Sequence, residues 1–370
     1  MRKVYKAFVI VVVALFISVG ISCFAPKQIV NDVVEPCVPP LSFDKNGDFT
    51  ILHLTDFHEW LGIELPVWGV EEQESLKPHL LSFINESVAL YQPDLVVLGG
   101  DNIFGLSAFY DLFAGLSIKT YKEIANTFEE LGVYWTLTFG NHDSEGVKTK
   151  YAFLNAISSY SYFIGGVESG KWHETHVTKA ENGESDYVSN FKIPVYNHSS
   201  QNVGYNLFIL DSGSYDYVNK VDGYRAITGT QTAWYESKIE SDVPSVMFAH
   251  IPFPECETAY LQNGGVGTWA PISPSYVPTN ILDAIMEHKN TRGVFFGHNH
   301  LNGWTGFYNA NNHRVMLGIT PMAQAHSYDD AHSLMSGRIV KLNSNGNFST
   351  FVFDSIDMQP DENAHLIYNV

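Results

Sequence analysis

The chain has 370 residues, and 45% of them are hydrophobic, so most of the chain can fold around a sizeable core. Its formal net charge is −19, with only 21 lysine and arginine residues. A diffusely acidic surface repels polyphosphate backbones, which excludes nucleic acid as a main partner.

Residues 1–22 have the pattern of an export signal peptide. Three basic residues within the first six precede an uncharged apolar run at residues 7–20, and this order is typical of secretory signals. Ser22 directly before Cys23 indicates a lipoprotein cleavage site, with Cys23 acylated. The alternatives are an uncleaved membrane anchor and ordinary secretion. All three export the folded part, to the cell envelope or beyond, and the first two add membrane contact through lipid or the anchor.

Residues 23–48 are expected to form a tether, because they carry four prolines and no clear periodicity. Cys37 lies in this segment, and an oxidising compartment permits its pairing with Cys256. Two unrelated thiols are the alternative.

From Phe49 onward, strand-like apolar runs alternate with helix-like segments. In chain order we predict strand 49–55, helix 78–91, strand 94–98, helix 121–131, strand 133–139, strand 205–211, helix 231–240, strand 245–248, helix 280–288 and strand 293–296. This alternation predicts an α/β layered fold with functional side chains on loops at one edge of the sheets.

Two stretches lack this regularity. Residues 151–200 are rich in Gly, Ser, Tyr and charge, and we expect an insertion or elaborated loop near the site. Residues 356–370 are polar and acidic, and we expect a loose tail.

Five short polar segments each follow a predicted strand or strand-like run. They are Asp56-Phe57-His58, Gly100-Asp101-Asn102, Gly140-Asn141-His142-Asp143, Ala249-His250 and Gly297-His298-Asn299-His300. Each is common alone, but together they supply nitrogen and oxygen ligands at strand ends, as a pair of divalent cations requires. We therefore predict two divalent metal ions, with Mn, Zn and Fe as the candidates.

The five segments resemble the calcineurin-like metallophosphoesterase superfamily. The neighbourhoods that are similar to its branch of purple-acid-phosphatase-29-like and fungal phosphatases are residues 100–105, 231–235 and 250–255. The resemblance implies one domain over residues 49–355, in which two mixed β-sheets pack as a sandwich flanked by helices.

The resemblance also implies the roles of seven metal ligands. Asp56, His58 and His300 would bind the first metal. The second metal would be bound by Asn141, His250 and His298. Asp101 would bridge both metals, because a carboxylate has two oxygens.

Two further residues are expected to serve catalysis. His142 would lie beside the metals as a general acid or transition-state stabiliser. Asp143 would orient it, and a loop-capping role for Asp143 is the alternative. The resemblance departs at Phe104, where purple acid phosphatases have a metal-binding Tyr, so we expect a colourless protein.

The leading functional hypothesis is an exported phosphoesterase that hydrolyses small phosphomonoesters by attack of a metal-bridging hydroxide. The alternative is a phosphodiesterase acting on nucleotides, cyclic nucleotides or phospholipid head groups, because no Lys or Arg is adjacent to a ligand segment. A minor alternative is a non-catalytic member that uses the fold for binding, although all seven ligand positions and His142 are present.

Overall fold

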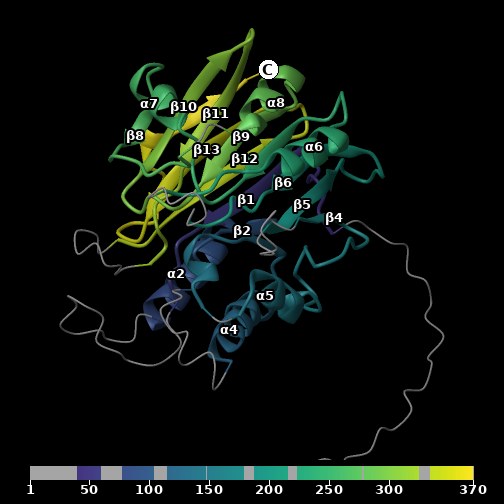
Figure 1. Ribbon diagram of the computed structural model, residues 1–370, viewed down its shortest axis with the longest axis vertical. Coiled ribbons are helices and arrows are strands. Elements are labelled where there is room, and N and C mark those ends of the chain that lie inside the picture. The colour runs from purple at the N-terminus through teal and green to yellow at the C-terminus, as the bar shows by residue number, and fades with distance from the viewer. Residues whose placement is uncertain are drawn as a thin grey trace, which may run out of the picture. The chain divides into compact units, whose positions relative to one another are not determined.

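Two mixed β-sheets form the centre of the fold, as predicted (Figure 1). The six-stranded sheet has the order β14 (Leu366–Tyr368), β13 (Phe348–Asp354), β12 (Ser336–Asn343), β1 (Asp48–Leu54), β2 (Leu95–Gly99) and β3 (Trp135–Thr138). The eight-stranded sheet has the order β4 (Glu174–Thr178), β5 (Tyr187–Tyr196), β6 (Val203–Ile209), β7 (Ser245–Phe248), β9 (Thr291–Phe296), β11 (His313–Ile319), β10 (Gly303–Ala310) and β8 (Val266–Thr268).

The structure is a computed structural model that describes residues 40–59, 77–103, 115–146, 148–178, 187–215, 223–276, 279–324 and 334–369. The predicted signal peptide, most of the predicted tether and Phe104 lie outside these ranges, and so does Cys37. Cys256 is buried as a free thiol. Within the described ranges we find no helix that is long and apolar enough to cross a membrane.

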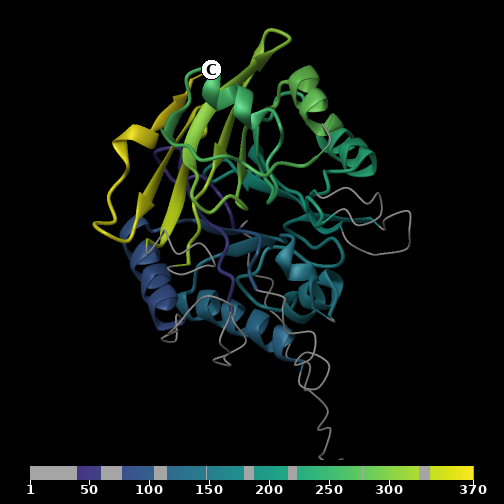
Figure 2. The same cartoon turned by 60° about the vertical axis from the view of Figure 1, so that its left-hand side comes forward.

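Helices cover both outer sides of the sheets. They are α2 (Lys77–Tyr91), α4 (Leu116–Leu131), α5 (Lys150–Ile157), α6 (Gly229–Lys238), α7 (Cys256–Leu261) and α8 (Asn280–His288). In both ribbon views α2, α4 and α5 lie together, across the strands from α6 and α8 (Figures 1 and 2). The four predicted helices are all present, and α6 begins at Gly229 because Thr228 and Gln231 form a capping box.

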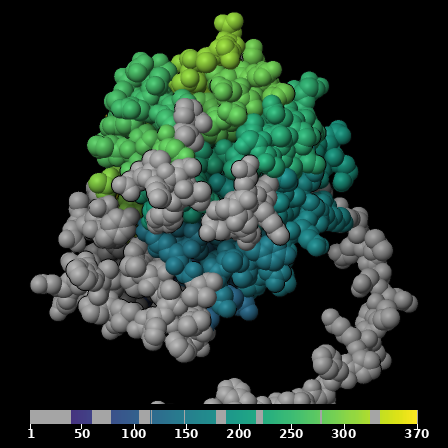
Figure 3. Space-filling view, in the orientation of Figure 1, coloured from purple at the N-terminus to yellow at the C-terminus, as the bar shows by residue number. Residues whose placement is uncertain are grey.

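The core strands are apolar on both faces because the large sheet lies between two hydrophobic clusters. On β7, Val246 and Phe248 belong to the cluster between the sheets, whereas Met247 packs with α6 and α8. Successive side chains of a strand point to opposite faces, so a strand that is buried on both faces has no alternating pattern. The space-filling view shows the surface of these layers, with teal segments from the middle of the chain next to green segments from later in it (Figure 3).

The stretch at residues 151–200 contains most of α5 and the strands β4 and β5 of the large sheet, so it is not the elaborated loop that we predicted, and the insertion stays a prediction. β5 lies between β4 and β6, and Val188 and Phe191 are fully buried. The pattern was missed because β5 also buries polar residues that bond internally. Asn190 Nδ2 donates to the carbonyl oxygens of His176 and Tyr187, at 2.9 Å each.

The two predicted loose ends are also ordered where the structure describes them. In the predicted tether, Leu41 and Phe43 are buried, and the Phe43 amide donates to the Tyr196 carbonyl at 2.9 Å. In the predicted tail, β14 pairs with β13, and the Tyr368 ring stacks on Phe348. Both segments are short and pair with distant strands, so their own sequence carries no clear strand signal.

Arg338 of β12 joins the two sheets through the core. It is fully buried, and its five N–H groups make hydrogen bonds of 2.8 to 3.0 Å to neutral oxygens. Four of the five acceptors lie on or next to β10 and β11 in the other sheet, in Trp304, Thr305, Ile319 and Thr320. Burial lowers the pKa of Arg338 to about 9. The hydrogen bonds of Arg338 in the core therefore fix the position of the two sheets, and of their loops, relative to each other.

Candidate metal centre

Six of the seven predicted ligands form two clusters where strands of both sheets end, and Asn141 precedes His142, whose amide donates to Asp101 Oδ1. β1, β2 and β3 are parallel neighbours in one sheet, as are β7 and β9 in the other, so the loops after them meet at one edge. Backbone hydrogen bonds tie the loops together: Asp56 donates to Gly100, His58 to Asp101 and Gly297 to His250, at 2.9, 2.9 and 3.1 Å. Ligands far apart in the chain are thereby placed side by side.

The first group of predicted ligands is compact. The ligand atoms of Asp56, His58 and His300 all lie within 4.8 Å of one another. Asp56 Oδ1 is 3.8 Å from His58 Nε2 and 3.5 Å from His300 Nε2. Three buried donor atoms at this spacing can hold one divalent cation between them.

The second group shares Asp101 with the first. The ligand atoms of Asp101, His250 and His298 form a second set within 4.8 Å. Asp101 Oδ2 lies 3.1 Å from His250 Nε2 and 3.9 Å from His58 Nε2, so the same oxygen faces both groups. This position fits a carboxylate that bridges two cations.

The buried polar atoms of the second group fit a metal better than they fit the protein alone. Among the described residues, Asn141 Oδ1 and His298 Nε2 are buried and have no hydrogen-bond partner, and such atoms are costly unless something else binds them. His250 Nδ1 lies 2.8 Å from the Gly99 carbonyl, so it carries the ring proton and leaves Nε2 for a ligand bond. Metal-binding histidines are typically held in this way.

Electrostatics in the second group also favour a cation. Burial alone would lower the pKa of His250, but the adjacent carboxylate of Asp101 raises it to about 9. Burial and the neighbouring His250 lower the pKa of His298 to about 3, so its ring is neutral and can donate a lone pair. In the metal-free protein the proton on His250 compensates the charge of Asp101, and a metal ion would take over that role.

The ligand loops adopt strained backbone conformations. Asp56, His58, Asp101 and His298 have φ angles of 57°, 44°, 48° and 70°, in the left-handed region that non-glycine residues rarely occupy. Such strain is concentrated at functional sites. Gly140 is required for a different reason, because a Cβ atom there would lie 2.1 Å from Asp101 Oδ1.

Asp143 ties two ligand loops together, which favours the loop-capping alternative over the orienting role. Its Oδ1 accepts from the amides of Asn102 and Ile103 and from the Tyr121 hydroxyl, and its Oδ2 accepts from the Gly140 amide at 2.7 Å. Burial and the charge of Asp101 raise the pKa of Asp143 to about 6, so these donors are needed to keep the carboxylate ionised.

His142 is paired with a residue that the sequence analysis missed. His142 Nδ1 lies 2.9 Å from Glu145 Oε2. The two residues lie on the short 3-10 turn His142–Ser144 and its C-cap, and the spacing of three residues is the signal that could have found the pair. Two aromatic residues were also missed, because no motif marks them: the Tyr215 hydroxyl bonds to Asn141 Nδ2, and the Tyr224 ring lies 4.3 Å from that of His298.

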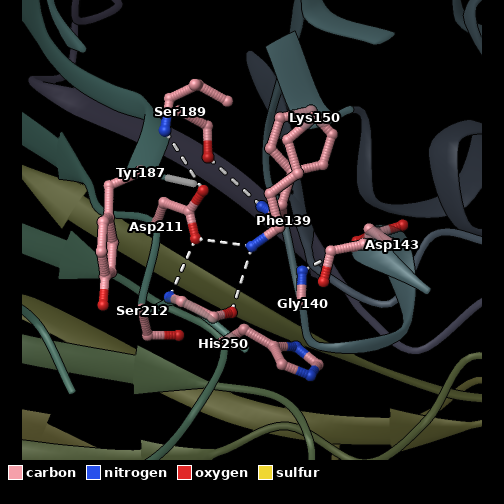
Figure 4. A network of polar contacts seen from close by, with 12 residues as sticks. Phe139, Gly140, Asp143, Lys150, Tyr187, Ser189, Asp211, Ser212 and His250 are labelled. Carbon is pink, nitrogen blue, oxygen red and sulfur yellow. Dashed lines mark hydrogen bonds and ion pairs between the residues drawn. The ribbon is translucent and has the colours of Figure 1, made fainter. Parts of the chain in front are cut away.

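A buried ion pair lies next to the loop that carries His250 (Figure 4). Lys150 Nζ lies 2.9 Å from Asp211 Oδ1, and both side chains are fully buried. Next to Asp211, the Ser212 hydroxyl accepts from the amide of Ile251, the residue after His250. Asp211 therefore lies next to the residue that contacts the His250 loop, and it belongs to none of the candidate metal clusters among the described residues.

These candidate ligands around one carboxylate form a candidate dinuclear metal centre of the kind found in phosphoester hydrolases. A family model for calcineurin-like phosphoesterases matches residues 49–302. This match covers more than half of the chain, and the chain therefore belongs to the calcineurin-like phosphoesterase family of metal-dependent phosphoester hydrolases. The resemblance predicted from the five segments is confirmed.

Relatives and a solved structure agree with this assignment. The chain is 26% identical to "Probable inactive purple acid phosphatase 14" of Arabidopsis thaliana, over 81% of this chain and 77% of that protein. It is 28% identical to "Phosphatase DCR2" of Saccharomyces cerevisiae, over 56% of this chain and 35% of that protein. A dimetal phosphatase from Danio rerio shares the fold, with a TM-score of 0.50 and 12% identity over 82% of this chain and 95% of that chain.

Replacing Asp143 tests whether it holds the loops or serves the reaction. In Asp143→Asn, an amide NH₂ group would face backbone N–H groups that now donate to the carboxylate. Two donors would then face each other, so we expect the free energy of unfolding to fall by about 1–3 kcal/mol. Metal content should fall with it, because both ligand loops lose their common anchor. Denaturant unfolding and elemental analysis measure these effects. Asp361→Asn is the control, since Asp361 accepts from the amide of Asn363 near the surface. A variant with parental stability and metal content but slow turnover would restore the orienting role.

Metal affinity should rise with pH, because the proton on His250 has to leave before a metal can bind. With a His250 pKa of about 9, the second metal should bind more tightly by up to ~tenfold per pH unit between about pH 6 and 9. Calorimetric titration with Mn²⁺ in two buffers of different ionisation enthalpy should reveal about one proton released when the second metal binds near neutral pH. Affinity that does not change with pH would contradict this assignment. His250→Asn, which has no titrating proton, should bind the second metal weakly and without proton release.

Proposed function

We propose that this protein is an exported phosphatase that hydrolyses small phosphomonoesters with two divalent cations. The observation that carries the proposal is the pair of ligand groups around Asp101 Oδ2, with His142 beside them. The ligand atoms of His58, Asp101 and His142 also lie within 4.8 Å of one another, so a group bound between the metals would be within reach of the His142 ring.

The cations, when bound, would supply Lewis-acid charge for the phosphoryl group and lower the pKa of an attacking water. Asp56, His58 and His300 would hold one, Asn141, His250 and His298 the other, and Asp101 both. The residues of the chain supply the remaining chemistry. Asn141 is a neutral ligand, so its place in the set keeps the centre positive for an anionic substrate.

His142 is the residue that we assign to the leaving group. Burial opposes protonation of His142, but the charges of Asp101 and Glu145 raise its pKa above the usual value. A protonated imidazole can donate its proton to the leaving oxygen as the phosphorus–oxygen bond breaks. This step matters most for monoesters of ordinary alcohols, whose leaving groups are poor, and it is the reason for placing the monoesterase first.

Two other functions are supported less well. Diester hydrolysis is favoured by one observation: no Lys or Arg is adjacent to any of the five ligand segments in the sequence, so these segments bring no cationic side chain for a phosphate dianion. A non-catalytic role is suggested by the word "inactive" in the name of the Arabidopsis relative. Against it stands the complete ligand set of this chain, since a binding-only member has no need to keep seven ligands and His142 in place.

The substrate class is tested by comparing p-nitrophenyl phosphate with bis-p-nitrophenyl phosphate, with Mn²⁺ added and with EDTA. We expect metal-dependent turnover with a higher kcat/KM for the monoester. Asp101→Asn should lose both activity and at least one metal, because the shared oxygen no longer carries a full charge. A clear preference for the diester would replace the monoesterase proposal with the phosphodiesterase. Two bound metals without turnover of either substrate would favour the binding role.

Export as a lipoprotein is proposed from residues 1–23, which lie outside the described residues. Cys23→Ala should remove lipid attachment and shift the protein from the membrane fraction to the soluble fraction, because the acylated residue is lost. Metabolic labelling with a fatty acid and cell fractionation measure this. Cys256→Ala is the matched control, and it should stay with the membrane. An unlabelled parent protein that remains in the membrane would point to the uncleaved anchor instead.

A further inference from the structure

Two residues outside every metal motif join a predicted metal ligand to the proposed acid. Asn141 Nδ2 donates to the Tyr215 hydroxyl at 2.9 Å, and that hydroxyl donates to Glu145 Oε1 at 3.1 Å. The other carboxylate oxygen, Glu145 Oε2, lies 2.9 Å from His142 Nδ1. The contacts run from Asn141 through Tyr215 and Glu145 to His142. Asn141 and His142 are adjacent in the third ligand segment, so the two outer residues connect both of them.

The directions of these hydrogen bonds fix which atom of Asn141 faces the metals. An ionised carboxylate only accepts, so Tyr215 has to give its single hydroxyl proton to Glu145. The hydroxyl can then only accept from Asn141, which selects the amide NH₂ group as the partner. Asn141 Oδ1 is left buried and has no hydrogen-bond partner among the described residues. The Tyr215 hydroxyl therefore holds Asn141 so that it presents oxygen and not nitrogen as a ligand.

The same carboxylate contacts the ring of His142. Because Nδ1 lies 2.9 Å from Glu145 Oε2, we assign Nε2, on the other side of the ring, to the substrate. The side chain of His142 is 11% exposed and that of Glu145 is 24% exposed, so the pair lies at the rim of the centre where a leaving group would depart. Asp143 cannot supply this support, because its oxygens already bind the Asn102, Ile103 and Gly140 amides.

Tyr215 is itself held in place by aromatic neighbours. It follows β6 and forms a β-bridge with Tyr224, whose ring lies 5.4 Å from that of Tyr215 and 4.3 Å from that of His298. The Tyr215 ring also meets His142 edge-on at 6.2 Å. Tyr215 thus reaches both the second ligand group and the proposed acid from a loop of the large sheet.

We propose that Glu145 and Tyr215 are positioning residues, which orient the His142 imidazole toward the leaving group and the Asn141 amide oxygen toward the second metal. This proposal rests on the proposed phosphoesterase function. It assigns a separate measurable effect to each residue. Loss of Glu145 should act on proton donation to the leaving group, and loss of Tyr215 should act on metal binding.

The test for Glu145 compares two monoesters in the full-length protein. p-Nitrophenyl phosphate has a leaving group that departs without a proton, whereas glycerol phosphate needs one. Glu145→Ala should lower kcat for glycerol phosphate by about 10- to 100-fold and should change kcat for p-nitrophenyl phosphate by less than about threefold. KM and metal content should stay at the parental values. Glu145→Gln, which keeps the size and one acceptor, should lose less, and it decides the question if Glu145→Ala does not fold.

The test for Tyr215 is a metal titration that does not depend on turnover. Tyr215→Phe should weaken binding of the second Mn²⁺ by about tenfold or more, because the Asn141 amide is then free to rotate. Binding of the first Mn²⁺ should not change. The control for both variants is Glu236→Ala, which removes the carboxylate of a Glu–His pair on the surface, 3.5 Å from His288.

The outcomes separate this inference from the proposed function. Equal losses of kcat for the two monoesters in Glu145→Ala and Glu145→Gln would overturn the role of Glu145. Parental affinity for both metals in Tyr215→Phe would overturn the role of Tyr215. If the parent protein hydrolyses neither monoester, the proposed function fails, and the metal titration still decides whether the Tyr215 contact orients Asn141.

Discussion

The candidate metal centre depends on one carboxylate that lies between predicted ligands from two different sheets. Asp101 follows a strand of the small sheet, and its Oδ2 lies 3.1 Å from His250 Nε2, which follows a strand of the large sheet. A displacement of about 1 Å between the sheets would be enough to impair such a centre. The bonds of Arg338 across the core and the apolar cluster between the sheets prevent it. The candidate ligands can therefore reach their positions only if the two sheets pack together in this way.

The loops at this edge store strain that the rest of the structure has to offset. Left-handed residues such as His58 and Asp101 cost about 1–3 kcal/mol each. The amide of His58 donates to the carbonyl of Asp101, and Asp143 accepts from the amides that follow Asp101. These bonds hold the two loops against each other before any metal arrives, and a preorganised site does not have to reorganise when it binds.

The place of the candidate ligands could be predicted from the sequence because each follows a strand, and parallel strands end at a common edge. Their division between two metals came from the family resemblance. The same reasoning failed where contacts are distant in the chain or where burial removes periodicity. β5 is buried on both faces and carries internal polar residues such as Asn190, so its sequence resembles a loop. Tyr215 has no motif of its own, and only the folded loops bring its hydroxyl to Asn141, 74 residues earlier in the chain.

The choice between the two roles that we considered for Asp143 has a physical basis that also explains the place of Glu145. A carboxylate next to a metal loop can either accept several backbone amides or hold a histidine ring, because each oxygen offers few lone pairs. Asp143 is fully committed to the amides of two loops. The ring of His142 then requires another carboxylate, and the next position on the same side of the 3-10 turn is Glu145. Structural anchoring and orientation of the proposed acid are thus divided between two acidic residues only two positions apart.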